Sequence, residues 1–312
     1  MIRGRSRHGN SDTRNNEVYT TLKHQGMTKK KNLNLTNAKI NSIKNNLFHR
    51  SLDIIEDFQT FPWHQYKGNI DTDQINSSQA IAIDFWGCIH SSPYKNELIN
   101  ELFGTKAEEW NIELEYTDCA LLNEPTSTQI DVFLQSPQKV IFVESKFTEK
   151  GGPCTQPLKQ CNGNYEIQTN PKSGVSSKCA LSGKKIRYWD FIEQVTDYKK
   201  DYDYTPCPFK GKEYQWMRTI CFAKAYSDSH NKIPYAPYLF YYDSPKCPIS
   251  GLVGKGNYLG TLEGHLKSPE FEAKSYNDCI EKCIDFLKSR DLDEMNVWEG
   301  LKQWISDKEA RL

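Results

Sequence analysis

The segment TQIDVFLQSPQKVIFVESKF, residues 128–147, constrains the fold of this chain more than any other stretch. It predicts two strands joined by a short turn. If the turn is centred on Pro137-Gln138 and has an even number of residues, the two residue numbers of each facing pair add up to 275. Asp131 then lies directly across from Glu144. Because side chains alternate along a strand, Lys146 then shares a face with Glu144, and Ser145 points to the other face.

Two carboxylates in facing positions could bind one cation. The Cα atoms of such residues lie roughly 4.5–5.5 Å apart, and hard cations prefer oxygen ligands. The acid-x-Lys spacing recurs at residues 197–199 and 272–274, both in stretches that predict helix. Charged side chains on a strand often belong to a solvent-exposed face and have no function. Residues 140–143, however, predict a buried strand, and charges this close to a core need a partner or a metal. The hairpin therefore predicts a metal-dependent hydrolase site.

Composition excludes several classes of protein. A chain of 312 residues with 37 % hydrophobic residues can bury one large core or two smaller ones. No apolar run reaches the roughly 18 residues of a membrane span, and the N-terminal stretch lacks the apolar segment of a secretory signal. Ten cysteines without an export signal favour a reducing compartment. We therefore expect a cytoplasmic protein without membrane contact.

Charge is distributed unevenly along the chain. Residues 1–50 carry 11 Lys and Arg against 2 acids, whereas the remaining 262 residues carry 29 basic and 38 acidic side chains. Residues 1–35 are polar and without periodicity, which predicts a disordered basic tail. Such a tail could contact nucleic-acid phosphates or simply be solvated.

The remaining patterns predict an alternation of helices and strands. We expect helices over residues 47–61, 77–89, 94–103 and 213–227, strands over residues 112–122 and 238–242, a Cys-rich insertion over residues 150–211 with a helix at 189–199, and two amphipathic helices in the last 45 residues. The order predicts an α/β architecture, a mixed sheet flanked by helices.

Several stretches of this chain match one known pattern: SSQAIAIDFWG (77–87), IELEY (112–116), TQIDVFLQ (128–135), FVESKFTE (142–149), CALSGKKIRYW (179–189) and CPFKGKEYQWMRTICFAKAYS (207–227). In their order the chain resembles the PD-(D/E)xK nuclease superfamily, especially its restriction-endonuclease-like group of uncharacterised specificity. The resemblance implies a nuclease domain over residues 36–260, which contains the insertion, followed by extra C-terminal helices over residues 261–312.

The resemblance also implies roles for individual residues. Asp131 and Glu144 match the metal-binding acids, and Lys146 matches the catalytic lysine. The superfamily uses a further upstream glutamate, for which Glu115 is favoured narrowly over Glu97 and Glu101 on the preceding helix.

A glutamine on the helix after the third strand orients the lysine or the attacking water in many of these nucleases. Gln215 in YQWMR matches it, and Arg218, one turn along, could bind a phosphate with two hydrogen bonds. Gln194 and Tyr198 match an alternative pattern, the Gln-x-x-x-Tyr of recombination-type nucleases, which we rank behind Gln215.

These residues imply a metal-dependent endonuclease that hydrolyses phosphodiester bonds in DNA, such as a restriction or phage-defence enzyme. Mg²⁺ or Mn²⁺ is the expected cofactor, DNA the expected partner, and a homodimer could cut both strands. Two other functions fit the sequence: a nucleic-acid-binding protein that keeps this fold with an idle site, and a zinc-stabilised interaction protein. The three charges kept together argue against the first, and only the cysteine segment supports the second.

The insertion contains four cysteines with gaps of 6, 17 and 27 residues, namely Cys154, Cys161, Cys179 and Cys207. Structural zinc sites usually show paired Cys-x2–4-Cys knuckles, which this segment lacks, so we favour unligated thiols over a Zn²⁺ site. Cys279 and Cys283 are four apart on an expected helix and should pack as small apolar residues. The histidines, His64 among them, show no metal spacing and no nucleophile partner.

Overall fold

The computed structural model describes residues 32–156, 179–199, 207–211, 213–253, 264–267 and 271–312. A five-stranded sheet has the order β3-β4-β5-β6-β7. Its strands are β3 (Asn111–Thr117), β4 (Gln129–Gln135), β5 (Val140–Lys146), β6 (Tyr235–Tyr241) and β7 (Glu272–Ser275). The first three are antiparallel, whereas β6 pairs in parallel with both β5 and β7. This is the predicted mixed sheet of an α/β protein, consistent with a restriction-endonuclease-like fold.

The β4–β5 hairpin has the predicted register. The pairs run from Gln135–Val140 to Val132–Val143, so the residue numbers sum to 275. The turn is closed by a hydrogen bond of 2.9 Å from Ser136 N to Lys139 O. Asp131 and Glu144 lie one residue beyond the last of these pairs, where the strands begin to separate.

One face of the sheet is covered by the first core helix, α3 (Ser78–Ser91), which contacts β3, β4 and β5. Ser77 caps α3 as predicted, since its side chain accepts a hydrogen bond from Ala80 N. Nearly every residue of α3 is buried, because the sheet, the 3-10 helix η1 (His49–Ile54) and the C-terminal helix α12 (Leu292–Ala310) surround it. A Cβ atom on Gly87 would lie 2.5 Å from Ser51 O, so only glycine allows η1 to approach α3 this closely.

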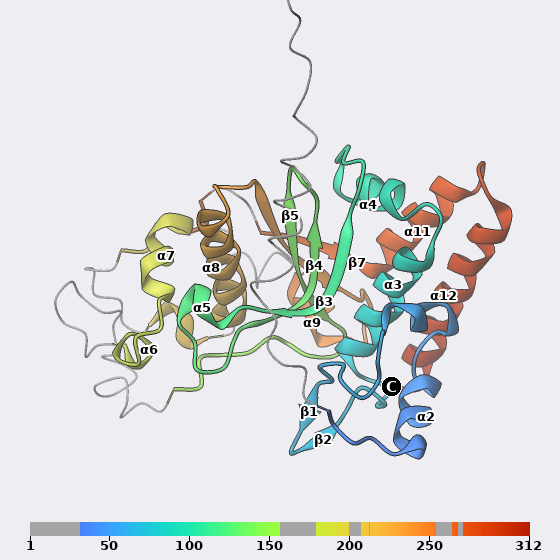
Figure 1. Cartoon of the computed structure of the whole chain (residues 1–312), viewed down its shortest axis with the longest axis horizontal. Helices are drawn as coiled ribbons and strands as arrows, with labels where there is room; N and C mark the ends of the chain where they lie inside the picture. Colours follow the sequence, from blue (N-terminus) through green and yellow to red (C-terminus); the bar gives the residue numbers. More distant parts are fainter. Residues whose placement is uncertain (1–31, 157–178, 200–206, 212, 254–263, 268–270) are drawn as a thin grey trace, which may run out of the picture.

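The opposite face is covered by α8 (Glu213–Ser229), which directly precedes β6 in the chain and contacts both β5 and β6. Helices α7 (Tyr188–Val195) and α5 (Cys119–Leu122) pack against α8 (Figure 1). The helices predicted over residues 213–227 and 189–199 are therefore present, although α7 ends earlier than expected. The sheet thus lies between two helical layers, with α3, α4, α11 and α12 on one side and α7 and α8 on the other.

The C-terminal helices complete the layer beside α3. They are α11 (Tyr276–Leu287) and α12, and the predicted pair of amphipathic helices is confirmed. α11 contacts α4 (Lys95–Phe103), which ends at Gly104 with φ +61° as its sequence predicted. Cys279 and Cys283 are buried in the main hydrophobic core, as expected for packed thiols. None of the helices among the described residues is long and apolar enough to cross a bilayer.

The prediction of a helix over residues 47–61 is wrong. The chain instead forms α2 (Asn37–Asn45) and the 3-10 helix η1. Thr36 caps α2, and the buried carboxylate of Asp84 accepts a hydrogen bond of 2.6 Å from Phe48 N, so the chain turns between the two helices. Asp84 lies 36 residues further along, which is why local spacing gave no sign of this turn.

Three further expectations are corrected by the structure. The strand expected over residues 112–122 ends at Thr117, because the Asp118 side chain accepts from Ala120 N and starts α5. Residues 272–274 belong to β7 and not to a helix, since they pair with β6 at the edge of the sheet. Residues 197–199 were expected in a helix over residues 189–199, but they lie beyond the end of α7 at Val195.

Smaller elements complete the described part of the chain: the β1 (Gln65–Tyr66) and β2 (Asn69–Ile70) hairpin, α6 (Ala180–Gly183), η4 (Pro208–Lys210) and α9 (Pro248–Val253). The expected disordered tail, residues 1–35, lies outside the described residues except for 32–35, which form neither helix nor strand. Residues 157–178 and 200–206 of the expected insertion also lie outside them.

Candidate active site

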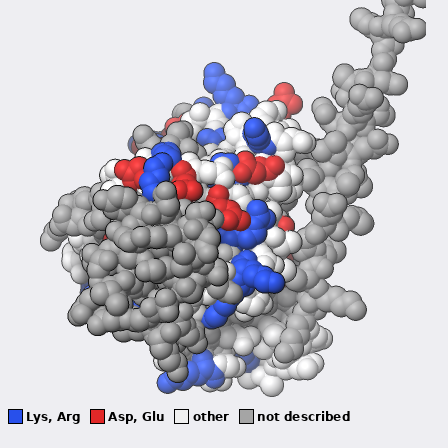
Figure 2. Space-filling model, turned by 90° about the vertical axis from the view of Figure 1, so that its left-hand side faces the viewer, with Lys and Arg blue, Asp and Glu red and all other residues white. Residues whose placement is uncertain are grey.

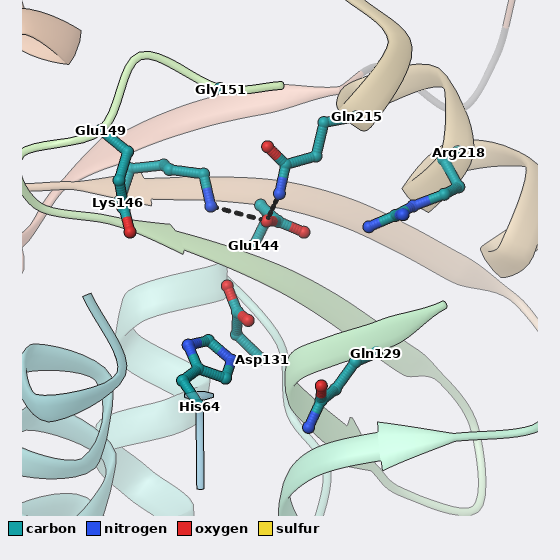
Figure 3. A pocket seen from close by; sticks show the side chains of 9 residues that line it. All are labelled: His64, Gln129, Asp131, Glu144, Lys146, Glu149, Gly151, Gln215 and Arg218. Atoms are coloured by element: carbon teal, nitrogen blue, oxygen red, sulfur yellow. Dashed lines mark hydrogen bonds and ion pairs between the residues drawn. The ribbon is translucent and has the colours of Figure 1, made fainter. Parts of the chain in front are cut away.

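A cleft of about 370 Å³ opens where β4 and β5 separate, beside the N-terminal half of α8. Asp131, Glu144, Lys146, Gln215 and Arg218, all singled out from the sequence, line this cleft (Figure 3). The other residues that line it are His64, Gln129, Glu149 and Gly151. The fold therefore brings together residues that are up to 154 positions apart in the chain, as from His64 to Arg218.

Lys146 and Glu144 form a buried ion pair. Lys146 Nζ donates to Glu144 Oε1 at 2.7 Å, and the two side chains are 8 % and 2 % exposed. Burial lowers the pKa of Lys146, but the charges of Glu144 and Asp131 outweigh it and raise the pKa above its ordinary value. The lysine is therefore a cation held at the cleft. Ser145, between the two, points to the other face of the sheet and is hydrogen-bonded to Tyr276 Oη at 2.7 Å.

Glu144 is fixed by two side chains of α8 as well. Gln215 Nε2 donates to Glu144 Oε1, and Thr219 Oγ1 donates to Glu144 Oε2 at 3.3 Å. Gln215 is held in turn by Gly152, whose backbone N–H donates to Gln215 Oε1 at 3.0 Å. Gln215 and Lys146 therefore both donate to Glu144 Oε1, so Gln215 is linked to the lysine only through this carboxylate (Figure 3).

Asp131 is buried beside this group. Its Oδ2 accepts a hydrogen bond of 2.6 Å from Ser145 N, which aims the carboxylate toward β5. Burial, and after it the charge of Glu144, raises the pKa of Asp131 well above the ordinary value. Both causes disfavour the charged form of the Asp131 carboxylate.

Glu115 lies on the other side of Asp131. The pairs Leu114–Val132 and Tyr116–Ile130 flank it, which puts Glu115 across from Asp131. Its φ of +58° is uncommon for a residue with a side chain, and such strain persists only where the surrounding structure holds it. Gln79 Nε2 donates to its Oε1 at 2.6 Å, and so holds the carboxylate in place.

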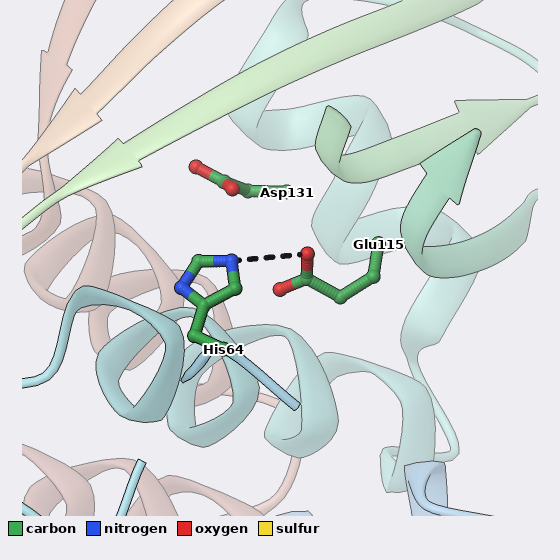
Figure 4. A group of neighbouring side chains, drawn as sticks. All are labelled: His64, Glu115 and Asp131. Carbon is green, nitrogen blue, oxygen red and sulfur yellow. Dashed lines mark ion pairs between the residues drawn. The ribbon is translucent and has the colours of Figure 1, made fainter. Parts of the chain in front are cut away.

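His64 faces Glu115 from the segment that precedes β1. His64 Nε2 lies 3.2 Å from Glu115 Oε2 (Figure 4). Burial lowers the pKa of His64, but the charge of Glu115 and the hydrogen bond to it outweigh burial and raise the pKa to about 9. One ligand atom from each of His64, Glu115 and Asp131 lies within 4.8 Å of the other two. Among the described residues, Glu144 belongs to no such group of three.

Arg218 extends the cleft along α8. Its Nε is buried and, among the described residues, has no hydrogen-bond partner, while its guanidinium lies 5.9 Å from the ring of Tyr214. Burial lowers the pKa of Arg218, but nearby charge, first that of Glu144, outweighs it and raises the pKa. A guanidinium beside a cleft, with one N–H unpaired among the described residues, is suited to bind an anion.

The structure separates the alternatives that the sequence left open. Glu97 and Glu101 are exposed on α4, so of the three candidate glutamates Glu115 is the one beside Asp131. Gln194 is exposed and donates to Asp190 O on its own helix, whereas Tyr198 is buried and stacks on His265. Gln215 therefore occupies the cleft, and the Gln-x-x-x-Tyr residues do not line it.

The cysteine segment lies only partly within the described residues. Cys154, Cys179 and Cys207 line one narrow pocket of about 20 Å³, and Cys161 lies outside the described residues. In the described part of the chain no group of three metal-ligating side chains includes a cysteine. The preference for thiols over a Zn²⁺ site stays a prediction.

Four side chains near the cleft were not singled out from the sequence: His64, Gln79, Gln129 and Glu149. His64 lies 51 positions before Glu115, and no spacing connects the two. Gln79 did carry a signal, because it is a polar residue at the start of the apolar run AIAIDFWGCI. Buried polar side chains are hydrogen-bonded, so Gln79 required a partner in the core.

A mixed sheet with acids and a lysine meeting where adjacent strands separate defines a restriction-endonuclease-like protein. Residues 7–243 match the model of the family described as Restriction Endonuclease associating with ARP. This match spans most of the 312 residues, so the chain belongs to that family. Searches of curated proteins and of solved structures gave no match.

Proposed function

We propose that this protein is a nuclease of the PD-(D/E)xK superfamily that uses a divalent metal ion to hydrolyse phosphodiester bonds in DNA. The observation that carries the proposal is the buried Glu144–Lys146 ion pair beside Asp131 in an open cleft. Buried charges are costly unless they are paired or bind a metal, and a solvated face would not hold them in this arrangement. A restriction or phage-defence endonuclease is the particular role that we infer.

The donor set fits a divalent cation. Asp131 and Glu144 offer carboxylate oxygens, the ligand type that Mg²⁺ and Mn²⁺ prefer. The raised pKa of Asp131 reflects burial first and then uncompensated negative charge, which a cation would offset. When bound, such an ion supplies Lewis acidity toward a phosphoryl oxygen and lowers the pKa of a bound water.

Lys146 supplies a fixed positive charge to the reaction. In hydrolysis the water loses a proton as its oxygen bonds to phosphorus, the bond from phosphorus to the 3′ oxygen breaks, and that oxygen takes up a proton. The phosphate gains negative charge on the way. Because Glu144 and the Ser145 carbonyl orient Lys146 Nζ, a remaining N–H can donate to the attacking water or to a phosphate oxygen. Gln215 and Thr219 keep Glu144 in the conformation that orients this lysine.

Arg218 and the N-terminal segment would bind the DNA backbone. The guanidinium of Arg218, which lines the cleft, suits a phosphate next to the one that is cleaved. Among the described residues, the face in Figure 2 carries Lys and Arg beside Asp and Glu, and neither sign covers it alone. Residues 1–50, with 11 basic against 2 acidic side chains, are therefore the main source of attraction for DNA that we infer.

Plasmid cleavage tests the proposal. Purified protein with supercoiled plasmid and Mg²⁺ or Mn²⁺ is expected to give nicked and linear DNA, and excess EDTA should abolish both products. Asp131→Asn should abolish them too, whereas Asp285→Asn, at an exposed position on α11, should leave them unchanged. Cleavage that survives EDTA would refute the metal mechanism. DNA binding without cleavage under all these conditions would indicate the idle-site alternative.

A further inference from the structure

The tip of the β1–β2 hairpin, residues 65–69, is an exposed surface next to the cleft (Figure 1). Among the described residues, the exposed large hydrophobic side chains are Tyr66, Leu292 and Leu312, and Tyr66 is the most exposed, at 65 %. A single apolar side chain on a surface is ordinary. Tyr66 differs because the hairpin is fixed beside the cleft and pairs its ring with a positive charge.

The base of the hairpin is fixed at the cleft. His64, which lines the cleft, directly precedes β1, and its carbonyl accepts a hydrogen bond of 3.2 Å from Asp71 N. Trp63 and Ile70, at the two ends of the hairpin, are buried in the smaller hydrophobic cluster. The Cα atom of Tyr66 is two residues from that of His64, hence at most about 7 Å away. This is about two base steps along a DNA strand, so a strand in the cleft can reach the tip.

The turn at the tip places a cation beside the aromatic ring. Lys67 and Gly68 form a two-residue turn with φ of +51° and +81°, the geometry that usually takes Asn-Gly. A lysine in this region is uncommon and marks a position at which to look for function. Its Nζ lies 5.1 Å from the centroid of the Tyr66 ring. Residues 62–70 include no acidic residue, so the hairpin itself does not offset this charge.

We propose that the β1–β2 tip binds a DNA strand that leaves the cleft, with Tyr66 stacked on an unpaired base and Lys67 paired with a phosphate. The inference deepens the nuclease function proposed above and rests on it for the presence of DNA in the cleft. Aromatic rings bind single strands by stacking on bases of any kind, and lysines neutralise the phosphates. In a duplex the bases stack on one another, so the ring reaches a base only where pairing has ended or opened.

Strand binding in EDTA measures this contact without any cleavage. The probe is a labelled oligothymidine strand, and its fluorescence anisotropy reports binding to the full chain. Tyr66→Ala should weaken binding by about 5- to 150-fold, the usual effect of removing one stacking ring. Tyr66→Phe keeps the ring and should bind like the unsubstituted protein. A blunt duplex of the same length should bind both variants with little change. Thermal unfolding checks that each variant is folded.

The control for Tyr66→Ala is Leu292→Ala, which removes an apolar side chain that is 62 % exposed, on α12. It should leave strand binding unchanged.

Lys67→Asn tests the phosphate contact, since asparagine tolerates the positive φ of this turn. The slope of log affinity against log salt should become shallower by about 0.7, the value for one phosphate of a single strand. Lys232→Asn is its matched control. Lys232 is exposed and also has a positive φ, +58°, but it precedes β6, whose first residue pairs with Val140 at the far end of β5 from Lys146. Its slope should not change.

The outcomes separate this inference from the proposed function. If folded Tyr66→Ala binds oligothymidine like Leu292→Ala, the contact is refuted, and plasmid cleavage would still support the nuclease. Weaker strand binding by Tyr66→Ala alone supports the contact, even if no plasmid is cleaved. Equal losses on strand and duplex would contradict stacking on an unpaired base, and so would an unsubstituted protein that does not bind the strand. A changed sedimentation coefficient of Tyr66→Ala with unchanged strand binding would assign the tip to contact between copies of the chain.

Discussion

Replacing Lys146 with methionine is expected to slow DNA cleavage by about 100- to 1000-fold, the usual effect of removing one donor that stabilises a transition state. Methionine keeps most of the volume of the side chain and removes its charge. Glu144 keeps its hydrogen bonds from Gln215 and Thr219 but loses its buried counter-charge, so the free energy of unfolding should fall as well, and thermal unfolding checks that the variant is folded before its rate is measured. Single-turnover cleavage of a labelled duplex measures the rate, and calorimetry measures ion binding.

Lys282→Met is the control for this substitution. Lys282 is an exposed lysine on α11, and its loss removes the same charge from the protein without touching the cleft. It should cleave at the rate of the unsubstituted protein. A Lys146→Met protein that cleaves as fast as the control would exclude Lys146 from the chemistry.

Lys308→Met is expected to lower the free energy of unfolding by about 3–5 kcal/mol, because it would leave a buried carboxylate without its counter-charge. Lys308 Nζ donates to Asp84 Oδ2 at 2.8 Å and to Asn46 O at 2.6 Å, and both charged side chains are almost fully buried. Urea denaturation followed by circular dichroism measures the change.

An exposed ion pair on the same helix provides the comparison. Lys302 on α12 pairs with Glu281 at 2.6 Å, with both side chains half exposed, so Lys302→Met should change stability by no more than about 1 kcal/mol. If Lys308→Met were as stable as Lys302→Met, the buried pair would not be the contact that holds α12 to α3.

This buried pair connects the C-terminal helices to the cleft through α3. Asp84 is in the middle of α3, while Ser78 and Gln79 lie at its start. Ser78 Oγ accepts from Phe147 N at 3.0 Å just beyond β5, and Gln79 holds Glu115. A rigid α3 therefore fixes the positions of β5 and of Glu115 together. Loosening of α12 should consequently affect the cleft, although no residue of α12 lines it.

The hairpin could be predicted from sequence because its constraints are local. A turn at Pro137-Gln138 and the alternation of side chains suffice to define the register, which brings Asp131, Glu144 and Lys146 to one place. The role of Gln215 was implied by the resemblance, since many of the similar nucleases carry a glutamine on the helix after the third strand. The mixed sheet followed from the order of the elements, since a helix must cross over before a parallel strand can pair.

The features that could not be predicted from the sequence depend on contacts between distant parts of the chain. β7 is a four-residue edge strand whose pairing with β6 decides its conformation, and its Glu-Ala-Lys sequence favours a helix instead. The break between α2 and η1 depends on Asp84. His64 joins the site only because Gln79 holds its backbone beside Glu115, and no sequence period carries that information.

The central claim is that a divalent ion binds at the cleft where β4 and β5 separate. An anomalous-difference map of crystals soaked in Mn²⁺ tests it most directly. We expect a peak within about 2.0–2.6 Å of an Asp131 carboxylate oxygen, the range for oxygen ligands of such ions. A map at saturating Mn²⁺ with no peak beside Asp131 would contradict the account.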